Sequence, residues 1–397
     1  MNFYFKRKGS QAPPFMEHCD GEDMTRRIAG GAMNQLGNTS KMITMKLLCA
    51  LLAAFIAVPA RTATVPPPLP PGVKVTHPDG SPLRAALGPV PESAVFKMEG
   101  WYLWDPSVIR VGDTWHLFAS RWPAEDKMNG WFRSHVIRAT SSSLFGPYQF
   151  QEVVLHPSKH PWATQAVHNP KVMKVDNRYL LYHLGIPVWQ TGFAWADAIE
   201  GPWTPVAKPV LATNNPSIWR RPDGSAYAVG KFKPKPTRDG EWDACMHAFE
   251  ASTIDGPYRL LGGPGNRLPG NFELEDPTVW HADGLYQVLC TDWESKATGI
   301  RKSVVHYTSV NGIDYDLVSQ VPVWSQSDPV PLANGGSFRV AGIERPQVVL
   351  GDDGQPLALL VSAYPEVKES EPTFIILRPM DLAAPSGPRP MNSPARP

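Results

Sequence analysis

The chain has 397 residues, and its 38 Lys and Arg residues against 37 Asp and Glu residues give a formal net charge of +1. This balance excludes a dominant polyanion-binding face, so nucleic acid is not an expected partner. The 32 Gly and 43 Pro residues interrupt the sequence too often for long helices and favour short strands joined by turns.

The first apolar segment has the features of a secretory signal. Residues 45–63 contain a basic start at Lys46, the apolar run LLCALLAAFIAV and small residues near the cleavage positions Ala60 or Ala63. Residues 1–44 lack apolar periodicity, and we interpret them as a mis-assigned or disordered extension. A membrane anchor is the alternative, but the run is short for a spanning helix. We expect a periplasmic or extracellular protein with no stable membrane insertion after cleavage.

Proline-rich segments flank the predicted domain. Residues 64–94 begin TVPPPLPPGVKV and predict an extended linker, residues 95–380 form a single domain, and residues 381–397 form a disordered tail. Cys245 and Cys290 lie in apolar runs. We expect buried free thiols there, with one disulfide as the alternative.

One short pattern occurs five times in the predicted domain. A polar residue stands directly before a proline, and a β-branched or aromatic run, a polar turn and a second apolar run follow. The five polar residues are Asp105, Asn169, Asn215, Asp276 and Arg345. A pattern repeated at such intervals indicates repeated sheets.

Further strands and turns follow each pair of runs. The third runs are SHVIRATS, TGFAWADA, ACMHAFEAS and SVVHYTSV, and the first three lead into turns at Gly146, Gly201 and Gly256, spaced 55 residues apart both times. Three to four strands in each of five repeats, without helices between them, predict an all-β, five-bladed β-propeller. A β-sandwich is the alternative, but it does not require near-identical strand starts at five places.

The repeats also indicate where the candidate catalytic residues lie. The first strand of each propeller blade lines the central channel, so the five polar residues are expected to meet at its mouth. Glu275 and Glu344 stand one position before two of them. Glycosidic bond hydrolysis needs one carboxyl group to protonate the leaving oxygen and another to activate water or attack the sugar, and Asp105 and Glu275 are the natural pair. For any single repeat, capping of a turn is the alternative role.

Over roughly residues 95–365, the motifs WDP, NNPS and EDP resemble those of the five-bladed propeller glycoside hydrolases of families 43 and 117. The resemblance implies an inverting, exo-acting enzyme on plant or algal oligosaccharides or polysaccharides. It implies Asp105 as general base, Glu275 as general acid and Asn215 at the position of an orienting aspartate. Family 43 implies β-xylosides or α-L-arabinofuranosides, and family 117 implies 3,6-anhydro-galactosides.

Asn215 departs from that family pattern, because an amide cannot raise the pKa of Glu275 by like-charge repulsion. Asp276, or burial among Trp104, Trp280 and Trp293, are the alternative causes of a raised pKa. The residues expected to bind substrate are His168, Asn169, Asp276, Trp104, Trp219, Trp280, Glu344 and Arg345.

Several of these assignments have structural alternatives. His168 is also compatible with a structural role, an ion pair near the axis explains Glu344 and Arg345 equally well, and Trp219 and Trp280 fall inside first strands, where packing between blades is expected. The tryptophans outside the predicted strands are better sugar platforms. These are Trp122, Trp131, Trp162 and Trp189.

No cofactor is required for this chemistry. Whether a metal is bound stays unknown from sequence, and a structural calcium ion in the propeller channel is an open alternative. A phosphorylase similar to family 130 is a rival function, which needs clustered cations such as Arg345, Arg221 and Lys231 to hold phosphate. A carbohydrate-binding propeller without catalysis is the third.

Overall fold

The computed structural model describes residues 66–69, 72–232, 245–262, 268, 273–367 and 370–382. The predicted signal segment and residues 383–397 of the predicted tail lie outside these ranges. Residues Thr62–Pro397 form one compact unit. Among the described residues, no helix combines the length and apolarity needed to span a membrane.

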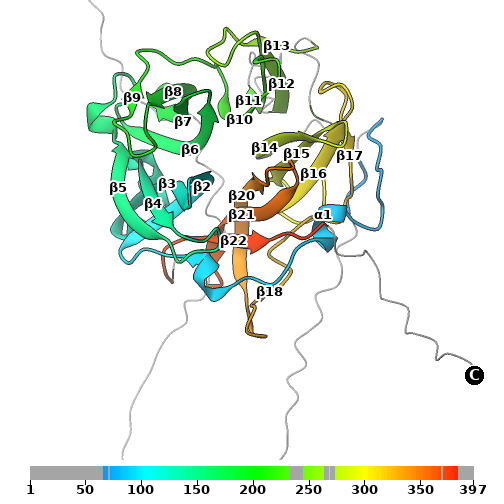
Figure 1. Cartoon of the computed structure of the whole chain (residues 1–397). Helices are drawn as coiled ribbons and strands as arrows, with labels where there is room; N and C mark the ends of the chain where they lie inside the picture. The colour runs from blue at the N-terminus through cyan, green and yellow to red at the C-terminus, as the bar shows by residue number, and fades with distance from the viewer. Residues whose placement is uncertain are drawn as a thin grey trace, which may run out of the picture. The chain divides into compact units, whose positions relative to one another are not determined.

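The described residues form a ring of five four-stranded antiparallel sheets, which confirms the predicted β-propeller (Figure 1). Blade I contains β2 (Trp101–Val111), β3 (Thr114–Pro123), β4 (His135–Ser141) and β5 (Gln149–Leu155). Blade II contains β6 (Ala166–Val175), β7 (Arg178–Ile186), β8 (Gln190–Ala196) and β9 (Thr204–Pro205). Blade III contains β10 (Asn214–Arg220), β11 (Ala226–Phe232), β12 (Cys245–Ala251) and β13 (Arg259–Leu260).

The last two blades follow the same order. Blade IV contains β14 (Leu274–Ala282), β15 (Leu285–Asp292), β16 (Ser303–Ser309) and β17 (Asp316–Leu317). Blade V contains β20 (Val340–Leu350), β21 (Pro356–Pro365), β22 (Phe374–Pro379) and β1 (Val95–Phe96). Figure 1 is a view along the propeller axis, and the first strands β2, β6, β10, β14 and β20 lie around the centre.

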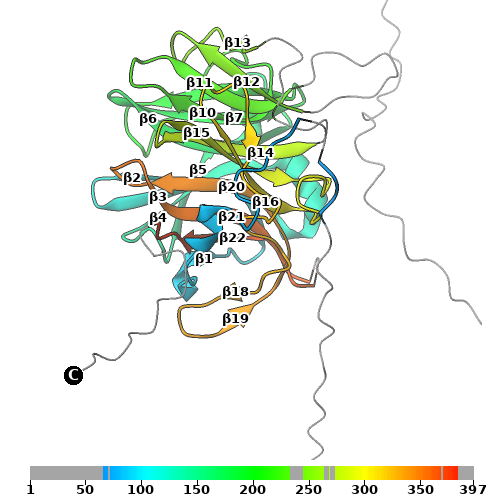
Figure 2. The ribbon, with the colours of Figure 1, turned by 90° about the vertical axis from the view of Figure 1, so that its right-hand side faces the viewer.

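Short elements lie outside the strands of the blades. The α-helix is α1 (Pro82–Ala85), and the 3-10 helices are η2 (Glu92–Ala94), η3 (Ala124–Asp126), η4 (Met128–Arg133) and η5 (Pro157–Lys159). The strands β18 (Val330–Pro331) and β19 (Ser337–Phe338) pair as a separate hairpin, which Figure 2 shows projecting beside blade V.

Every first strand contains the same irregularity at its polar-proline pair. The residue before proline has a positive φ in all five blades, and the strand register shifts there. The φ angles are 56° for Asp105, 54° for Asn169, 47° for Asn215, 55° for Asp276 and 61° for Arg345. Proline has no N–H to donate to the ladder, so a sheet accommodates it at a β-bulge. The repeated sequence pattern is therefore a repeated bulge.

The turns between third and fourth strands also follow the sequence. Gly146, Gly201 and Gly256 have φ angles of 74°, 98° and 85°. Residues other than glycine rarely adopt this left-handed region, which explains the regular spacing of these three glycines. These turns precede the outer strands of blades I, II and III.

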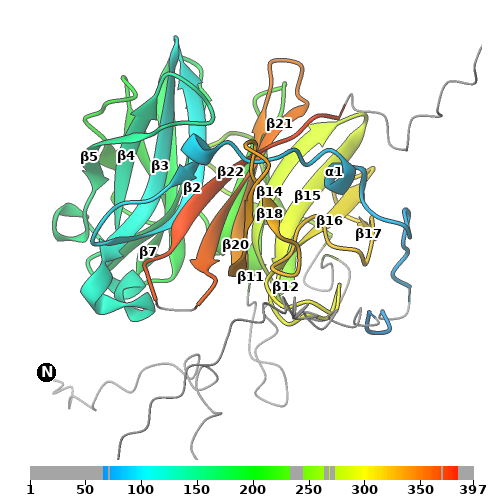
Figure 3. The same ribbon diagram turned by 90° about the horizontal axis from the view of Figure 1, so that it is seen from below.

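The N-terminal segment differs from the extended linker predicted for residues 64–94. Leu83, Val90 and Ala94 are buried in the core, and Val75 forms a bridge to β17. Figure 3 shows α1 beside the strands of blade IV. The apolar residues between the prolines make this segment part of the packed unit.

The two cysteines of the propeller are both buried, and Cys290 carries a free thiol. Cys290 belongs to the hydrophobic cluster of blades III and IV, and Cys245 is the first residue of β12 in blade III. Burial raises the pKa of the Cys290 thiol well above its usual value. This thiol is therefore an apolar packing group at neutral pH.

Strand β1 completes blade V from the other end of the chain. Val95 and Phe96 pair with Ile376 and Ile375 of β22. The Phe96 side chain is 5% exposed, and its ring centroid lies 6.0 Å from that of Tyr148 in blade I. Phe96 thus joins the last blade to the first.

We expect Phe96→Ala to lower the free energy of unfolding by about 3–5 kcal/mol, because it leaves a cavity where blade V meets blade I. Phe150→Ala is the matched control, since that ring is 41% exposed, and its loss should not exceed about 1 kcal/mol. Urea unfolding followed by fluorescence measures both values. Equal losses would contradict the closing role of β1.

Candidate active site

The bulges bring charged side chains of three blades together on the axis. Nε of Arg345 lies 3.1 Å from Oδ1 of Asp105, and its Nη1 pairs with Oδ1 of Asp276. The side chains of Asp105 and Asp276 are 0% and 1% exposed, and that of Arg345 is 13% exposed. One guanidinium therefore bridges the two axial carboxylates that the sequence placed at equivalent positions.

Asp105 is held as a carboxylate. Its Oδ2 lies 3.0 Å from Nε2 of His168. The same oxygen accepts hydrogen bonds from the Ser120 hydroxyl at 2.9 Å and from the backbone N–H of Asn169 at 3.1 Å. Burial alone raises the pKa of Asp105, but His168, Arg345 and these hydrogen bonds outweigh it and lower the pKa to about 2. Asp105 is thus ionised at neutral pH, as a general base must be.

Asp276 has the opposite tendency. Asn215 donates from Nδ2 to Oδ1 of Asp276 at 2.8 Å, so its amide contacts the Asp276 carboxyl group. Burial raises the pKa of Asp276 well above its usual value, and the nearby Glu275, Glu344 and Asp105 add to this against the effect of Arg345. Asp276 is the axial carboxyl group that most readily keeps a proton.

Three acceptor oxygens on the axis are buried without a hydrogen-bond donor among the described residues. They are Oδ1 of Asp105, Oδ1 of Asn215 and Oδ2 of Asp276. The Arg345 ion pair to Asp105 Oδ1 is not aligned as a hydrogen bond. Buried acceptors of this kind need partners, and the hydroxyl groups of a sugar or a water molecule can supply them.

Glu275 lies at the mouth, where its side chain is 16% exposed. Lys231 of β11 donates to both Glu273 and Glu275, so the two carboxylates share one ammonium. Burial raises the pKa of Glu275, but Lys231 and Arg345 lower it more, and the net direction is downward. The raised pKa that the sequence predicts for Glu275 is therefore absent. The contact with Lys231, which the sequence does not reveal, holds this pKa down.

Burial, only partly offset by Lys231, gives Glu273 a raised pKa. Sequence reasoning missed Glu273, which carries no proline signal and stands two positions before Glu275.

Glu344 belongs to a second ion pair on the same rim. Its Oε1 accepts from Lys302 at 2.8 Å and from the Tyr364 hydroxyl at 2.9 Å. The Trp104 ring packs edge-on against Tyr364, with the centroids 5.0 Å apart. Lys302 also lies 4.8 Å from the ring centroid of Trp293. Trp104 and Glu344 thus lie in one rim cluster, and sequence reasoning missed Lys302 and Tyr364 there.

Lys171 is a buried cation that sequence reasoning also missed. It lies in β6, its Nζ donates to the Pro277 carbonyl, and only 3% of it is exposed. Burial, opposed by Asp276 and Asp105, lowers the pKa of Lys171 to about 7. The signal was a lysine directly after the proline of the second polar-proline pair, inside a predicted first strand.

The predicted tryptophans separate into two groups. Trp219 stacks on His281 with 5.3 Å between centroids, and Trp280 is buried and lies parallel to His306. Trp219 packs against the neighbouring blade IV and Trp280 packs within its own blade, and both partners lie outside the axial group. The structure gives no reason to place either of them in the site.

Trp122 and Trp131 lie beside His168. The ring centroid of Trp131, in η4, is 5.4 Å from that of His168 and 5.7 Å from that of Trp189. Trp122 is fully buried within β3, not outside the strands as predicted. Trp162 lies flat over Gly185 and Gly192, where a Cβ atom would clash with its ring. Trp131 thus lies next to the axial His168, and Trp189 lies next to Trp131.

The carboxylates of Glu275, Asp276 and Glu344 offer ligand atoms within 4.8 Å of one another, which tests the channel calcium alternative. Each of these carboxylates already has a cationic partner, namely Lys231, Arg345 and Lys302 respectively. A divalent ion would have to displace them. This donor set therefore does not fit calcium.

Comparison with solved structures finds the same fold in glycoside hydrolases. A family 43 β-xylosidase/α-arabinofuranosidase from a compost microbial metagenome, in complex with xylotriose, has a TM-score of 0.50 at 16% identity, covering 76% of this chain and 94% of its own. A family 117 glycoside hydrolase from Zobellia galactanivorans has a TM-score of 0.52 at 14% identity, covering 75% and 90%.

A third similar structure is an RGII complex, with a TM-score of 0.54 at 12% identity, covering 82% of this chain and 95% of its own. No family model matches the sequence, and no curated protein matches it significantly. The likeness to the family 43 and 117 propellers is thus one of fold.

The stability of the axis should depend on pH through Asp105. A carboxyl group whose pKa is lowered on folding, here from 3.8 to about 2, stabilises the protein above the unfolded value. This contribution, about 2 kcal/mol, is lost as the pH falls from about 4 to about 2. The difference in unfolding free energy between wild type and Asp105→Asn should shrink over that range, measured by urea unfolding at each pH.

The control for that experiment is Asp113→Asn, because Asp113 lies in the same blade with its side chain fully exposed. A difference for Asp105→Asn that stays constant from pH 4 to pH 2 would contradict the assignment.

Removal of divalent cations should leave the protein unchanged, since lysine and arginine already neutralise the rim carboxylates. We expect the same thermal unfolding midpoint in EDTA and in millimolar calcium chloride, measured by differential scanning fluorimetry. A midpoint that rises with calcium would show that the ion displaces these cations.

Proposed function

We propose that the chain is a glycoside hydrolase that cleaves O-glycosidic bonds of oligosaccharides or polysaccharides at the axial site. The observation that carries this proposal is the ring of buried acceptor oxygens of Asp105, Asn215 and Asp276 beside partly exposed carboxylates at the mouth. Acceptors of this kind suit sugar hydroxyls, and paired carboxyl groups suit acid–base hydrolysis. The shared fold with family 43 and 117 enzymes supports the same class.

Asp105 is the proposed general base. It is ionised, its Oδ2 is occupied by His168 and Ser120, and its Oδ1 keeps a lone pair for a water proton. His168 and Asn169 act on substrate indirectly, by holding this carboxylate in place. In the proposed inverting reaction, Asp105 removes the proton of the water that attacks the anomeric carbon.

Glu275 is the proposed general acid, because it is the carboxyl group of the pair that reaches solvent and so can contact the leaving oxygen. Substrate over the mouth excludes the remaining water from Glu275, and this desolvation favours its neutral form. Asp276 is the competing acid, since its raised pKa suits a proton donor but it is 1% exposed. Variants of the two residues separate these roles.

The solved structures with the same fold and the aromatic residues near His168 support one substrate class. The family 43 neighbour is in complex with xylotriose, which supports xylosides and arabinofuranosides as the first substrates to test. Trp131 and Trp189 supply flat surfaces for a sugar next to His168. The predicted signal at residues 45–63 supports action in the periplasm or outside the cell.

A carbohydrate-binding propeller without catalysis is the second candidate, because an asparagine stands at position 215 and Asp105 is 1% exposed. A phosphorylase has less support. Arg221 bonds to Tyr286 and lies 3.6 Å from Glu250, apart from the axis, while Lys231 and Arg345 are engaged by carboxylates. These cations do not form a phosphate cluster.

We expect Asp105→Asn to lower kcat by about 10²–10⁴-fold on every substrate that the wild type hydrolyses, because activation of water is lost. Glu275→Gln should lose as much on oligosaccharides but little on 2,4-dinitrophenyl glycosides, whose leaving group needs no proton. Steady-state kinetics on xylosides, arabinofuranosides and 3,6-anhydro-galactosides measures both, with Asp113→Asn as the unchanged control.

Three outcomes would revise the proposal. The leaving-group signature in Asp276→Asn, but not in Glu275→Gln, would make Asp276 the acid. A retained anomeric configuration, seen by NMR of the first product, would exclude inversion. Binding of oligosaccharides without turnover by the wild type would favour the non-catalytic candidate.

A further inference from the structure

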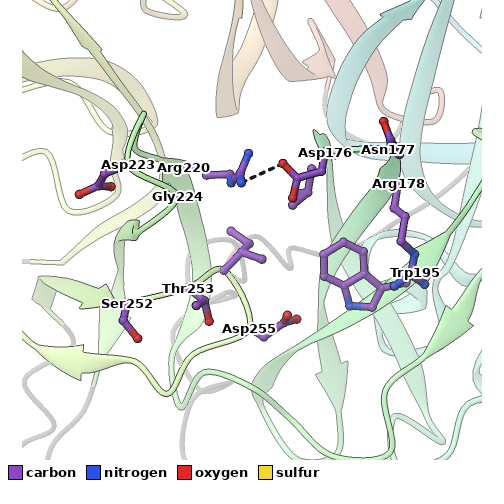
Figure 4. A pocket seen from close by; sticks show the side chains of 12 residues that line it. Asp176, Asn177, Arg178, Trp195, Arg220, Asp223, Gly224, Ser252, Thr253 and Asp255 are labelled. Carbon is purple, nitrogen blue, oxygen red and sulfur yellow. Dashed lines mark ion pairs between the residues drawn. The ribbon is translucent and has the colours of Figure 1, made fainter.

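A hollow with a volume of about 720 Å³ lies between blades II and III, away from the axial site. It is lined by the turn from Val175 to Arg178 that follows β6, by Arg220 at the end of β10, and by the turn after β12 (Figure 4). Asn169 lies six residues before Val175 on β6, so roughly 20 Å of strand separates the bulge from this hollow. The hollow is therefore at the other end of the blades.

One wall of the hollow is aromatic. Trp195 of β8 is partly exposed, and the guanidinium of Arg178 lies 5.0 Å from its ring centroid. Figure 4 shows the indole between Arg178 on one side and the hollow on the other. Cation and ring hold each other in place, so Trp195 supplies a fixed apolar surface in this wall.

Polar groups surround this surface. Asp176 and Arg220 form an ion pair of 3.0 Å across the hollow, and Asp255, Asn177 and Ser252 lie around it. Nε of Arg220 is buried and has no acceptor among the described residues. Donors and acceptors thus stand next to a flat apolar ring, as they do in sites that bind sugars.

The charges exclude other ligand classes. Arg178 is paired with Asp197 at 3.0 Å and Arg220 with Asp176, so an anion finds no uncompensated cation in the lining. The carboxylate of Asp223 accepts from Ser225 within its own turn. Among the described residues, the lining carboxylates do not gather as a metal-binding group. A neutral ligand rich in hydroxyl groups fits what remains.

We propose that this hollow is a second carbohydrate-binding site, in which one sugar ring stacks on Trp195 while its hydroxyls bond to Asp255, Asn177 and the Asp176–Arg220 pair. Its volume lies within the range of roughly 300–1,000 Å³ that is usual for small-molecule sites. The nature of the ligand rests on the proposed function, since a glycosidase gains from a second contact with its polymer. The site raises the local concentration of polymer at the axial mouth.

The test is affinity electrophoresis in native gels that contain soluble arabinoxylan, arabinan or agarose. We expect at least one polymer to retard the wild type. Trp195→Ala should raise the dissociation constant for that polymer by about tenfold. Asp255→Ala, at an exposed turn position, should weaken it too without touching the core. Unchanged retardation in both variants, or no retardation of the wild type by any of the three polymers, would overturn the proposal.

Trp115→Ala is the matched control. Trp115 is also a partly buried strand tryptophan beneath an arginine, with Arg110 at 5.9 Å, but no residue of blade I lines this hollow. It should retain wild-type retardation. Loss of retardation in Trp115→Ala equal to that in Trp195→Ala would mean that the effect is a general loss of packing.

Kinetics separates this proposal from the proposed function. Trp195→Ala should hydrolyse small aryl glycosides like the wild type, within about twofold, while its KM for the polymer rises. If the wild type hydrolyses nothing, the proposed function fails but the gel still tests the second site. Retardation that is lost in Asp105→Asn and kept in Trp195→Ala would place all polymer binding at the axis.

Discussion

The structure depends on one backbone constraint, the proline that interrupts the hydrogen-bond ladder of each first strand. Because proline cannot donate, the strand bulges there and the preceding residue takes a positive φ in all five blades. A left-handed conformation is unfavourable for most side chains by about 1–2 kcal/mol. Asparagine and aspartate tolerate it best, and this explains why four of the five positions hold one of them.

The five bulges are equivalent in backbone but not in charge. Asp105 and Asp276 face Arg345 across the axis, and the two asparagines fill the positions between them. Ion pairs buried to this degree do not stabilise a fold efficiently, because desolvation offsets most of their attraction. Three charges on the axis agree with the proposed catalytic role, because ionisable groups with shifted pKa values cluster at functional sites.

Much of the fold was predictable because it is local. Runs such as SHVIRATS and SVVHYTSV became β4 and β16, and the glycines at 146, 201 and 256 became left-handed turns. The polar-proline positions also met on the axis as expected. Repetition made these local signals reliable, since each blade tests the same interpretation again.

Contacts between residues far apart in the chain could not be predicted from the sequence. The pairing of Lys231 with Glu275 joins positions 44 residues apart, and it reversed the expected direction of the Glu275 pKa. Trp219 and Trp280 follow their prolines closely, but each residue along a strand adds about 3.3 Å, so they end near the far side of the blades. The packing of residues 72–94 and of β1 likewise depends on partners near the C-terminus.

Closure of the ring by β1 has a consequence for how the chain reaches its fold. Residues 95 and 96 pair with residues 375 and 376, so the fourth strand of blade V is synthesised before everything else in the ring and finds its place only after the last strand exists. Contacts of such sequence separation form late and slowly. Until β22 emerges, the edge of the first finished blades stays uncovered, and the growing chain is at its most vulnerable to mispairing.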